Sequence, residues 1–303
     1  MSTPSLALPL QGGGDMVAKG FKGWSSGLLG VLIFSGTLPA TRVAVATFDP
    51  IFFTLARAAI AGVLAVLILL VLRQPRPARS DGRALLVVAF GVVVGFPLLL
   101  ALVLRHVSAA HATVFVGLLP MATVMFGVLH GDKNPRGLFW LFSLSGSLVV
   151  AGFAMGQGIG VSLFDDLLML VAVVVCGLGY AEGARLARRM GGWQVICWAL
   201  VLALPLMLPL CLWMLPGNLQ QAAWPAWLGL GYVSLFSMLI GFFFWYRGLA
   251  LGGIASVSQL QLLQPFFGLG LAALLLGEHV SAMMVASALA VALCVFGARR
   301  FAG

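Results

Sequence analysis

The chain has 303 residues, of which 62% are hydrophobic and 8% are charged, and its formal net charge is +9. A soluble domain carries about 25% charged residues, so this composition excludes a water-soluble globular protein. The apolar residues form continuous runs such as residues 50–72. These runs lack the alternation of a membrane β-strand and are long enough to cross a bilayer as helices.

Along the chain, hydropathy and helix-breaking residues predict a flexible tail at residues 1–23 and then ten membrane-spanning helices. The predicted helices cover residues 24–45, 50–72, 83–104, 109–130, 136–155, 164–184, 193–215, 226–246, 254–276 and 280–298. The expected fold class is an all-α integral membrane protein with ten transmembrane helices.

Basic residues are concentrated on one side of this topology. Fourteen of the seventeen Lys and Arg residues precede the first helix, follow the last, or lie in loops on the same side as the termini. Cytoplasmic loops are enriched in Lys and Arg. The pattern therefore predicts a multi-pass membrane protein with both termini in the cytoplasm, and it explains the positive charge without nucleic acid.

The two halves resemble each other when the sequence is shifted by 145 residues. The shift places Pro120 on Pro265 and Gly152 on Gly297. Each half then holds five helices, an odd number, so the second copy must enter the membrane from the opposite side. We expect two inverted-topology repeats, at residues 24–155 and 156–303, with a site near the midplane between them, as in secondary transporters.

Short motifs occur in an order that is typical of one transporter family. The first predicted helix contains Phe34–Arg42 (FSGTLPATR). The second starts at Asp49–Pro50 and continues with Ala56–Ala58, and late in the chain Pro265 is followed by Leu275–Glu278 (LLGE). With these motifs the chain resembles the drug/metabolite transporter (DMT) superfamily, in its EamA-type branch.

The resemblance covers residues 24–300 and implies a ten-helix carrier that moves small metabolites, often outward, by alternating access. Within the superfamily the chain looks most like bacterial inner-membrane amino-acid exporters, including the exporters of aromatic amino acids. This resemblance implies a location in the bacterial inner (plasma) membrane. Asp132 departs from the pattern, because the family commonly has Glu at that place.

Polar side chains inside a bilayer are costly and are the first candidates for a binding site. Ser258, Gln261 and Gln264 recur at three-residue spacing in the helix predicted at 254–276, so they share one helical face. Pro265 follows and frees a backbone carbonyl one turn earlier. These groups could bind the carboxylate and ammonium of a zwitterion, or they could only join neighbouring helices.

The helix predicted at 109–130 is the pseudo-symmetric counterpart and carries Thr113 and His111. His111 could exchange a proton near neutral pH, but we favour the interpretation that it lies at the outer membrane interface. Tyr180 is expected to line the substrate cavity.

Prolines in membrane helices mark bends. Pro120 and Pro265 occupy equivalent positions in the two halves, and with Pro39 they are expected to act as hinges during alternating access.

Arg57 and two aromatic residues are predicted to be structural. We expect Arg57 to reach outward along the second helix and pair with Asp49 or a helix carbonyl rather than with substrate. Trp245 and Tyr246 are expected to belong to an aromatic belt at the membrane interface.

The chain lacks a Walker A or HExxH motif. We therefore expect no enzyme activity, no cofactor and no metal site, and we expect the partners to be a small-molecule substrate and the lipid bilayer. A channel or facilitator, a multidrug-type exporter and an intramembrane enzyme are the alternatives. The coupling ion and the oligomeric state, a monomer included, are left open.

Overall fold

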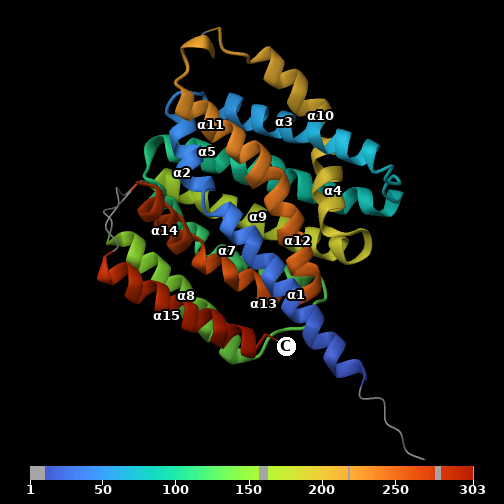
Figure 1. The fold of residues 1–303 in the computed structure, drawn as a ribbon, viewed down its shortest axis with the longest axis vertical. Coiled ribbons are helices and arrows are strands. Elements are labelled where there is room, and N and C mark those ends of the chain that lie inside the picture. Colours follow the sequence, from blue (N-terminus) through green and yellow to red (C-terminus); the bar gives the residue numbers. More distant parts are fainter. Residues whose placement is uncertain (1–10, 157–162, 218, 277–280, 303) are drawn as a thin grey trace, which may run out of the picture.

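A computed structural model of the chain describes residues 11–156, 163–217, 219–276 and 281–302. Within these ranges the chain forms helices joined by short turns, and no β-strand occurs there (Figure 1). In the described residues, nine stretches of helix are long and apolar enough to cross a membrane. The all-helical membrane fold predicted from the sequence is confirmed.

The first half contains eight α-helices and two shorter elements. The α-helices are α1 (Gln11–Phe34), α2 (Thr37–Val45), α3 (Pro50–Val71), α4 (Gly82–Val88), α5 (Phe96–His106), α6 (Ala109–Val116), α7 (Leu119–Leu129) and α8 (Gly137–Met155). The shorter elements are the 3-10 turn η1 (Arg79–Asp81) and the π-helical segment η2 (Ala89–Gly95), which joins α4 to α5.

The second half contains seven α-helices and three shorter elements. The α-helices are α9 (Leu163–Met190), α10 (Gly192–Trp213), α11 (Trp224–Tyr232), α12 (Gly241–Gly252), α13 (Ile254–Ser258), α14 (Gln264–Leu276) and α15 (Ala282–Arg300). The shorter elements are the 3-10 segments η3 (Leu219–Gln221) and η5 (Gln259–Leu263), and the π-helical segment η4 (Val233–Ile240).

Three predicted spans are interrupted in the structure. The span predicted at 24–45 breaks at Ser35–Gly36, between α1 and α2, and the span predicted at 109–130 breaks at Gly117–Leu118, between α6 and α7. The span predicted at 254–276 contains the 3-10 segment η5. Hydropathy alone misses such breaks, because the backbone is interrupted where the side chains remain largely apolar.

The flexible tail predicted at residues 1–23 is wrong for residues 11–23, which belong to α1. The prediction took the limit of the apolar run as the limit of the helix. The backbone N–H and C=O groups of a helix bond to one another, so a helix can continue beyond the bilayer into water. Residues 1–10 lie outside the described part of the chain.

Helix boundaries recur along the chain. A shift of 145 residues carries Ala109, the first residue of α6, onto Ile254, the first residue of α13. The same shift carries the start of α7 onto the start of α14, and the start of α8 onto the start of α15. Such matching is expected of two related five-helix repeats.

The helices pack in pairs around a central helix (Figure 1). α3 runs alongside α10 at one edge, α8 runs alongside α15 at another, and α1 crosses α12 between them. The crossing is close because glycines meet there: a Cβ on Gly248 would lie 2.6 Å from the Gly27 backbone nitrogen. α9 contacts α4, α5, α7, α10 and α12, so it forms the middle of the bundle.

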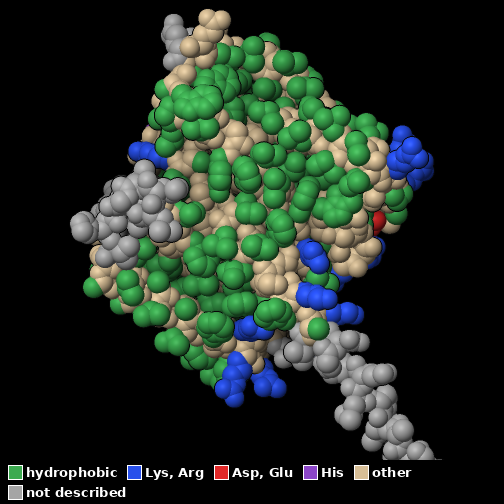
Figure 2. All heavy atoms as spheres, viewed as in Figure 1, with side chains coloured by type: hydrophobic (Ala, Val, Ile, Leu, Met, Phe, Trp, Pro, Cys, Tyr) green, Lys and Arg blue, Asp and Glu red, His purple; other side chains and the backbone are tan. Residues whose placement is uncertain are grey.

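The two ends of the bundle differ in charge. One end, called here the arginine-rich end, holds η1, the last turn of α9 and the C-terminal end of α15. Figure 2 shows Lys and Arg side chains gathered mainly toward that end. The opposite end holds the start of α3, the end of α5 and the first turn of α9, where Asp165 and Asp166 lie.

Candidate functional site

A narrow cavity lies inside the bundle and receives side chains from both halves of the chain. The volume of the cavity is about 40 Å³. Elements α1, α2, α3, η2, α5, α6 and α7 form its wall on one side, and α9, η4, α12, η5 and α14 complete it. Its polar and aromatic lining residues include Phe34, Arg57, Tyr180, Phe242, Gln261 and Gln264.

The break between α1 and α2 lies at this cavity, and side chains of the second half satisfy its carbonyls. Gln264 Nε2 donates to the Phe34 carbonyl at 3.1 Å, and the Tyr232 hydroxyl donates to the Ile33 carbonyl at 2.5 Å. Gly36 is required at the break, because a Cβ there would lie 2.6 Å from the Tyr232 hydroxyl oxygen. Gln264 therefore both lines the cavity and joins two helices.

Arg57 is the charged group of the cavity. It lies about two turns into α3 and is only 3% exposed. Its Nε has no hydrogen-bond partner, and no ion pair with Arg57 forms among the described residues. A buried, unpaired guanidinium is costly. Arg57 therefore marks a place where a ligand can supply the missing negative charge.

The predicted pairing of Arg57 with Asp49 is wrong. Asp49 instead caps α3, where it accepts from the Ile51 amide at 2.9 Å, and it lies 3.7 Å from Arg105. About seven residues of helix, on the order of 10 Å, separate the cap from Arg57. With Asp49 occupied at the helix start, the guanidinium faces the bundle interior rather than the membrane surface.

Tyr180 and Gln261 share the cavity wall with Arg57, and their role in substrate binding stays a prediction. Both side chains are buried. The Gln261 Oε1 has no hydrogen-bond partner within the described part of the chain. The cavity thus offers an open acceptor together with a buried cation.

Aromatic rings form the apolar part of the wall. The Phe34 and Phe242 rings lie 5.0 Å apart, and Phe242 packs against Tyr180 at 5.9 Å. Behind them, Trp245 and Tyr246 are fully buried. The predicted aromatic belt at these two positions is wrong, because α12 packs between α1, α9 and α10 and turns this face inward.

The other predicted binding residues do not line the cavity. Ser258 is buried and donates to the Ala255 carbonyl at 3.4 Å, and Thr113 is buried on α6. Of the face predicted through Ser258, Gln261 and Gln264, only the two glutamines line the cavity. His111 lies at the opposite end, where it contacts Asp166.

All three predicted hinge prolines stand close to the start of a helix that follows a break. Pro120 and Pro265 are the second residues of α7 and α14, and Pro39 is the third residue of α2. Proline fits the first turn of a helix because its missing amide has no partner there. Their action as hinges stays a prediction.

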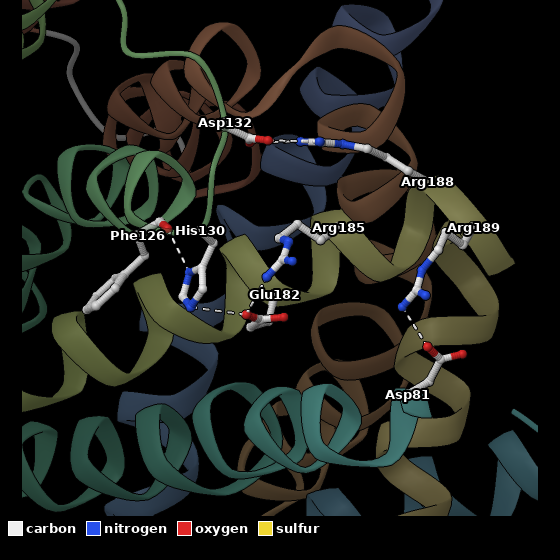
Figure 3. Close-up of polar contacts among 8 residues, drawn as sticks. All are labelled: Asp81, Phe126, His130, Asp132, Glu182, Arg185, Arg188 and Arg189. Atoms are coloured by element: carbon white, nitrogen blue, oxygen red, sulfur yellow. Dashed lines mark hydrogen bonds and ion pairs between the residues drawn. The ribbon is translucent and has the colours of Figure 1, made fainter. Parts of the chain in front are cut away.

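Ion pairs join neighbouring elements at the arginine-rich end (Figure 3). Arg188 makes two bonds to the Asp132 carboxylate, at 2.9 and 2.8 Å, and Arg189 lies 2.5 Å from Asp81. Asp81 precedes α4 and Asp132 follows α7, so both pairs fasten α9 to its neighbours. The partners are separated by 56 and 108 residues, which is why sequence reasoning did not find them.

The cavity groups suit recognition rather than bond breaking. Among the described residues, no group of three His, Cys, Asp or Glu side chains is placed to hold a metal ion. A guanidinium, an amide oxygen and aromatic rings can together bind a molecule that has a carboxylate, a donor and an apolar body.

Known proteins show similarity over nearly the whole chain. The sequence model of the EamA-like transporter family matches residues 21–155 and again residues 163–299. A relative from Bacillus subtilis (strain 168), "Uncharacterized transporter YdeK", is 64% identical over 284 residues, which are 94% of this chain and 99% of the relative. A crystal structure of a protein that is 18% identical shares the fold, with a TM-score of 0.72 over 92% of this chain and 97% of that chain.

Proposed function

The chain belongs to the EamA-like transporter family and is a membrane transporter, and we propose that it exports amino acids with apolar or aromatic side chains by alternating access. The single observation that carries this proposal is the buried Arg57 in an aromatic-walled cavity, without an ionic partner among the described residues. In a low-dielectric site a carboxylate is the natural complement of such a guanidinium.

The remaining cavity groups match the rest of an amino acid. The open Gln261 Oε1 accepts from the substrate ammonium, and the neighbouring Tyr180 hydroxyl is a second polar contact. Phe34 and Phe242 supply rings against which an apolar or aromatic side chain packs. We expect the substrate to move without covalent change, since the groups proposed to hold it bind charge and apolar surface.

Counterflow in liposomes tests this function. Purified protein in vesicles loaded with unlabelled L-phenylalanine is expected to accumulate labelled L-phenylalanine transiently, without ATP. L-Leucine and L-tryptophan should compete, whereas L-lysine should not, because its cationic side chain meets aromatic rings and Arg57. Vesicles without protein are the control.

Three outcomes would contradict the proposal. Uptake without a transient excess over the outside concentration indicates a channel or facilitator. Chemical change of the label indicates an enzyme. Competition by cationic dyes but by no amino acid indicates a multidrug-type exporter.

The orientation in the membrane is proposed from the charge of the two ends. We expect the arginine-rich end, with both termini, to face the cytoplasm across the plasma membrane. A cysteine at the exposed Ser80 of η1 should react with an impermeant maleimide only from the cytoplasmic side. A cysteine at Asn218, which lies outside the described residues, should react only from outside. Labelling of both positions from one side would contradict the inverted arrangement.

A further inference from the structure

Two histidine–carboxylate pairs join the same two spans, one pair at each end of the bundle. At the arginine-rich end, His130 follows α7 and lies 3.3 Å from Glu182 of α9 (Figure 3). At the opposite end, His111 Nε2 of α6 lies 2.6 Å from Asp166 Oδ1 in the first turn of α9. α6 and α7 lie along one span, so the two pairs fasten that span to α9 at both ends.

The two histidines differ in their second ring nitrogen. His130 Nδ1 bonds to the Phe126 carbonyl at 2.7 Å, so both of its nitrogens have partners. The His111 side chain is only 5% exposed, and its Nδ1 is buried without a hydrogen-bond partner in the described part of the chain. An ionised Asp166 can only accept, so Nε2 carries the ring hydrogen and Nδ1 keeps a free lone pair.

We propose that His111 is a proton-binding switch that opens the opposite end of the bundle. A proton from water binds the Nδ1 lone pair, and the neutral imidazole becomes an imidazolium whose Nε2–H still faces Asp166. The new Nδ1–H has no acceptor in the present packing, and a buried donor without an acceptor is costly. Protonation therefore favours an arrangement in which the ring reaches water.

The surroundings allow that movement. Asp166 is 28% exposed, so the ring and the carboxylate can move toward water together, with their attraction intact. Val116 and Leu119, which follow His111 on the same span, line the cavity. An outward movement of the paired first turns of α6 and α9 therefore widens the route from this end to the cavity.

Other charges near this end are already paired among themselves. Asp165 of α9 lies 3.5 Å from His106 of α5, which is 64% exposed. Arg105 of α5 pairs with Asp49, and Arg42 of α2 donates to the carbonyls at the end of α5. α8, which also packs against α6, contains no ionisable residue. Asp166 is the carboxylate in contact with the His111 ring.

The first test needs no substrate. Cys176 lines the cavity, so its reaction with a maleimide reports access, once Cys197, Cys211 and Cys294 are replaced by alanine. His111→Gln keeps an amide donor for Asp166 but cannot take up a proton. At about pH 7.5 both proteins should react at the same rate, and at about pH 5.5 the protein with His111 should react severalfold faster.

Both proteins carry the same cysteine, so comparing their reaction rates at one pH removes the effect of pH on the reactivity of the thiol itself. His106→Gln is the matched control: it removes an exposed histidine at the same end and should leave the acid response unchanged. Equal rates for His111 and His111→Gln at both pH values, or slower reaction with His111 in acid, would overturn the switch.

The second test uses L-phenylalanine counterflow and rests on the proposed function only for the choice of substrate. Acid in the bath should raise the exchange rate severalfold with His111 and not with His111→Gln, since the charge of phenylalanine is constant over this range. An acid response that survives in His111→Gln overturns the switch. If no variant exchanges phenylalanine, the proposed substrate class is wrong. The reaction rates of Cys176 with maleimide then test the His111 switch without counterflow.

Discussion

Replacing Arg57 with leucine is expected to abolish L-phenylalanine exchange while raising the thermal stability of the purified protein. Loss of one partner from a buried, hydrogen-bonded charge pair costs about 2–5 kcal/mol of binding, which is an affinity at least roughly thirtyfold weaker. The empty transporter, in contrast, no longer buries an unpaired charge. Counterflow and a melting curve on the same preparation measure both effects.

Two further variants make this result specific. Arg105→Leu removes an arginine that is 56% exposed at the opposite end, and it should change neither exchange nor melting by much. Arg57→Lys keeps the charge but loses the planar fork that holds a carboxylate, so its affinity should be intermediate. Intact exchange in Arg57→Leu would contradict the proposed role. Lost exchange together with a lower melting temperature would make Arg57 a structural residue.

The membrane spans were predictable because the length and hydropathy of the apolar runs agree with the residues that mark the start of a helix. The second helix, predicted at 50–72, is α3 (Pro50–Val71), since Asp49 caps it and Pro50 suits its first turn. The break at Gly36 was not predictable. Its cause is the Tyr232 hydroxyl and the Gln264 amide, which come from the other half and satisfy the carbonyls that the break leaves open.

The candidate site was predictable in part from polar side chains within predicted membrane helices. Gln261 and Gln264 were predicted from their spacing along one helix, Tyr180 was predicted to line the cavity, and all three line it. Arg57 was misjudged because the nearest carboxylate in the sequence seemed to be its partner. The pairing of His111 with Asp166, 55 residues apart, depends on how α6 meets α9, and no local pattern records that contact.

Removing the side-chain amides of Gln264 and Gln261 is expected to have different effects on stability and on substrate affinity. Gln264→Ala leaves the Phe34 carbonyl without its side-chain donor at the broken first span, so it should lower stability by about 1–3 kcal/mol. The affinity of the surviving protein should change little. Gln261→Ala removes an acceptor that has no partner among the described residues. It should weaken binding by about 1.5–3 kcal/mol if it accepts from an ammonium, with stability nearly unchanged because water can take its place.

Gln259→Ala is the matched control for this pair. Gln259 lies in the same 3-10 segment and is fully buried, but it does not line the cavity, and both of its amide atoms lack a partner within the described residues. Its removal should leave affinity unchanged and stability equal or higher, since an unsatisfied buried amide is lost. Melting curves and counterflow affinities for the three variants separate the two roles. If Gln261→Ala lowers the melting temperature and spares affinity, Gln261 joins helices, and the acceptor for the substrate ammonium must then be sought at Tyr180.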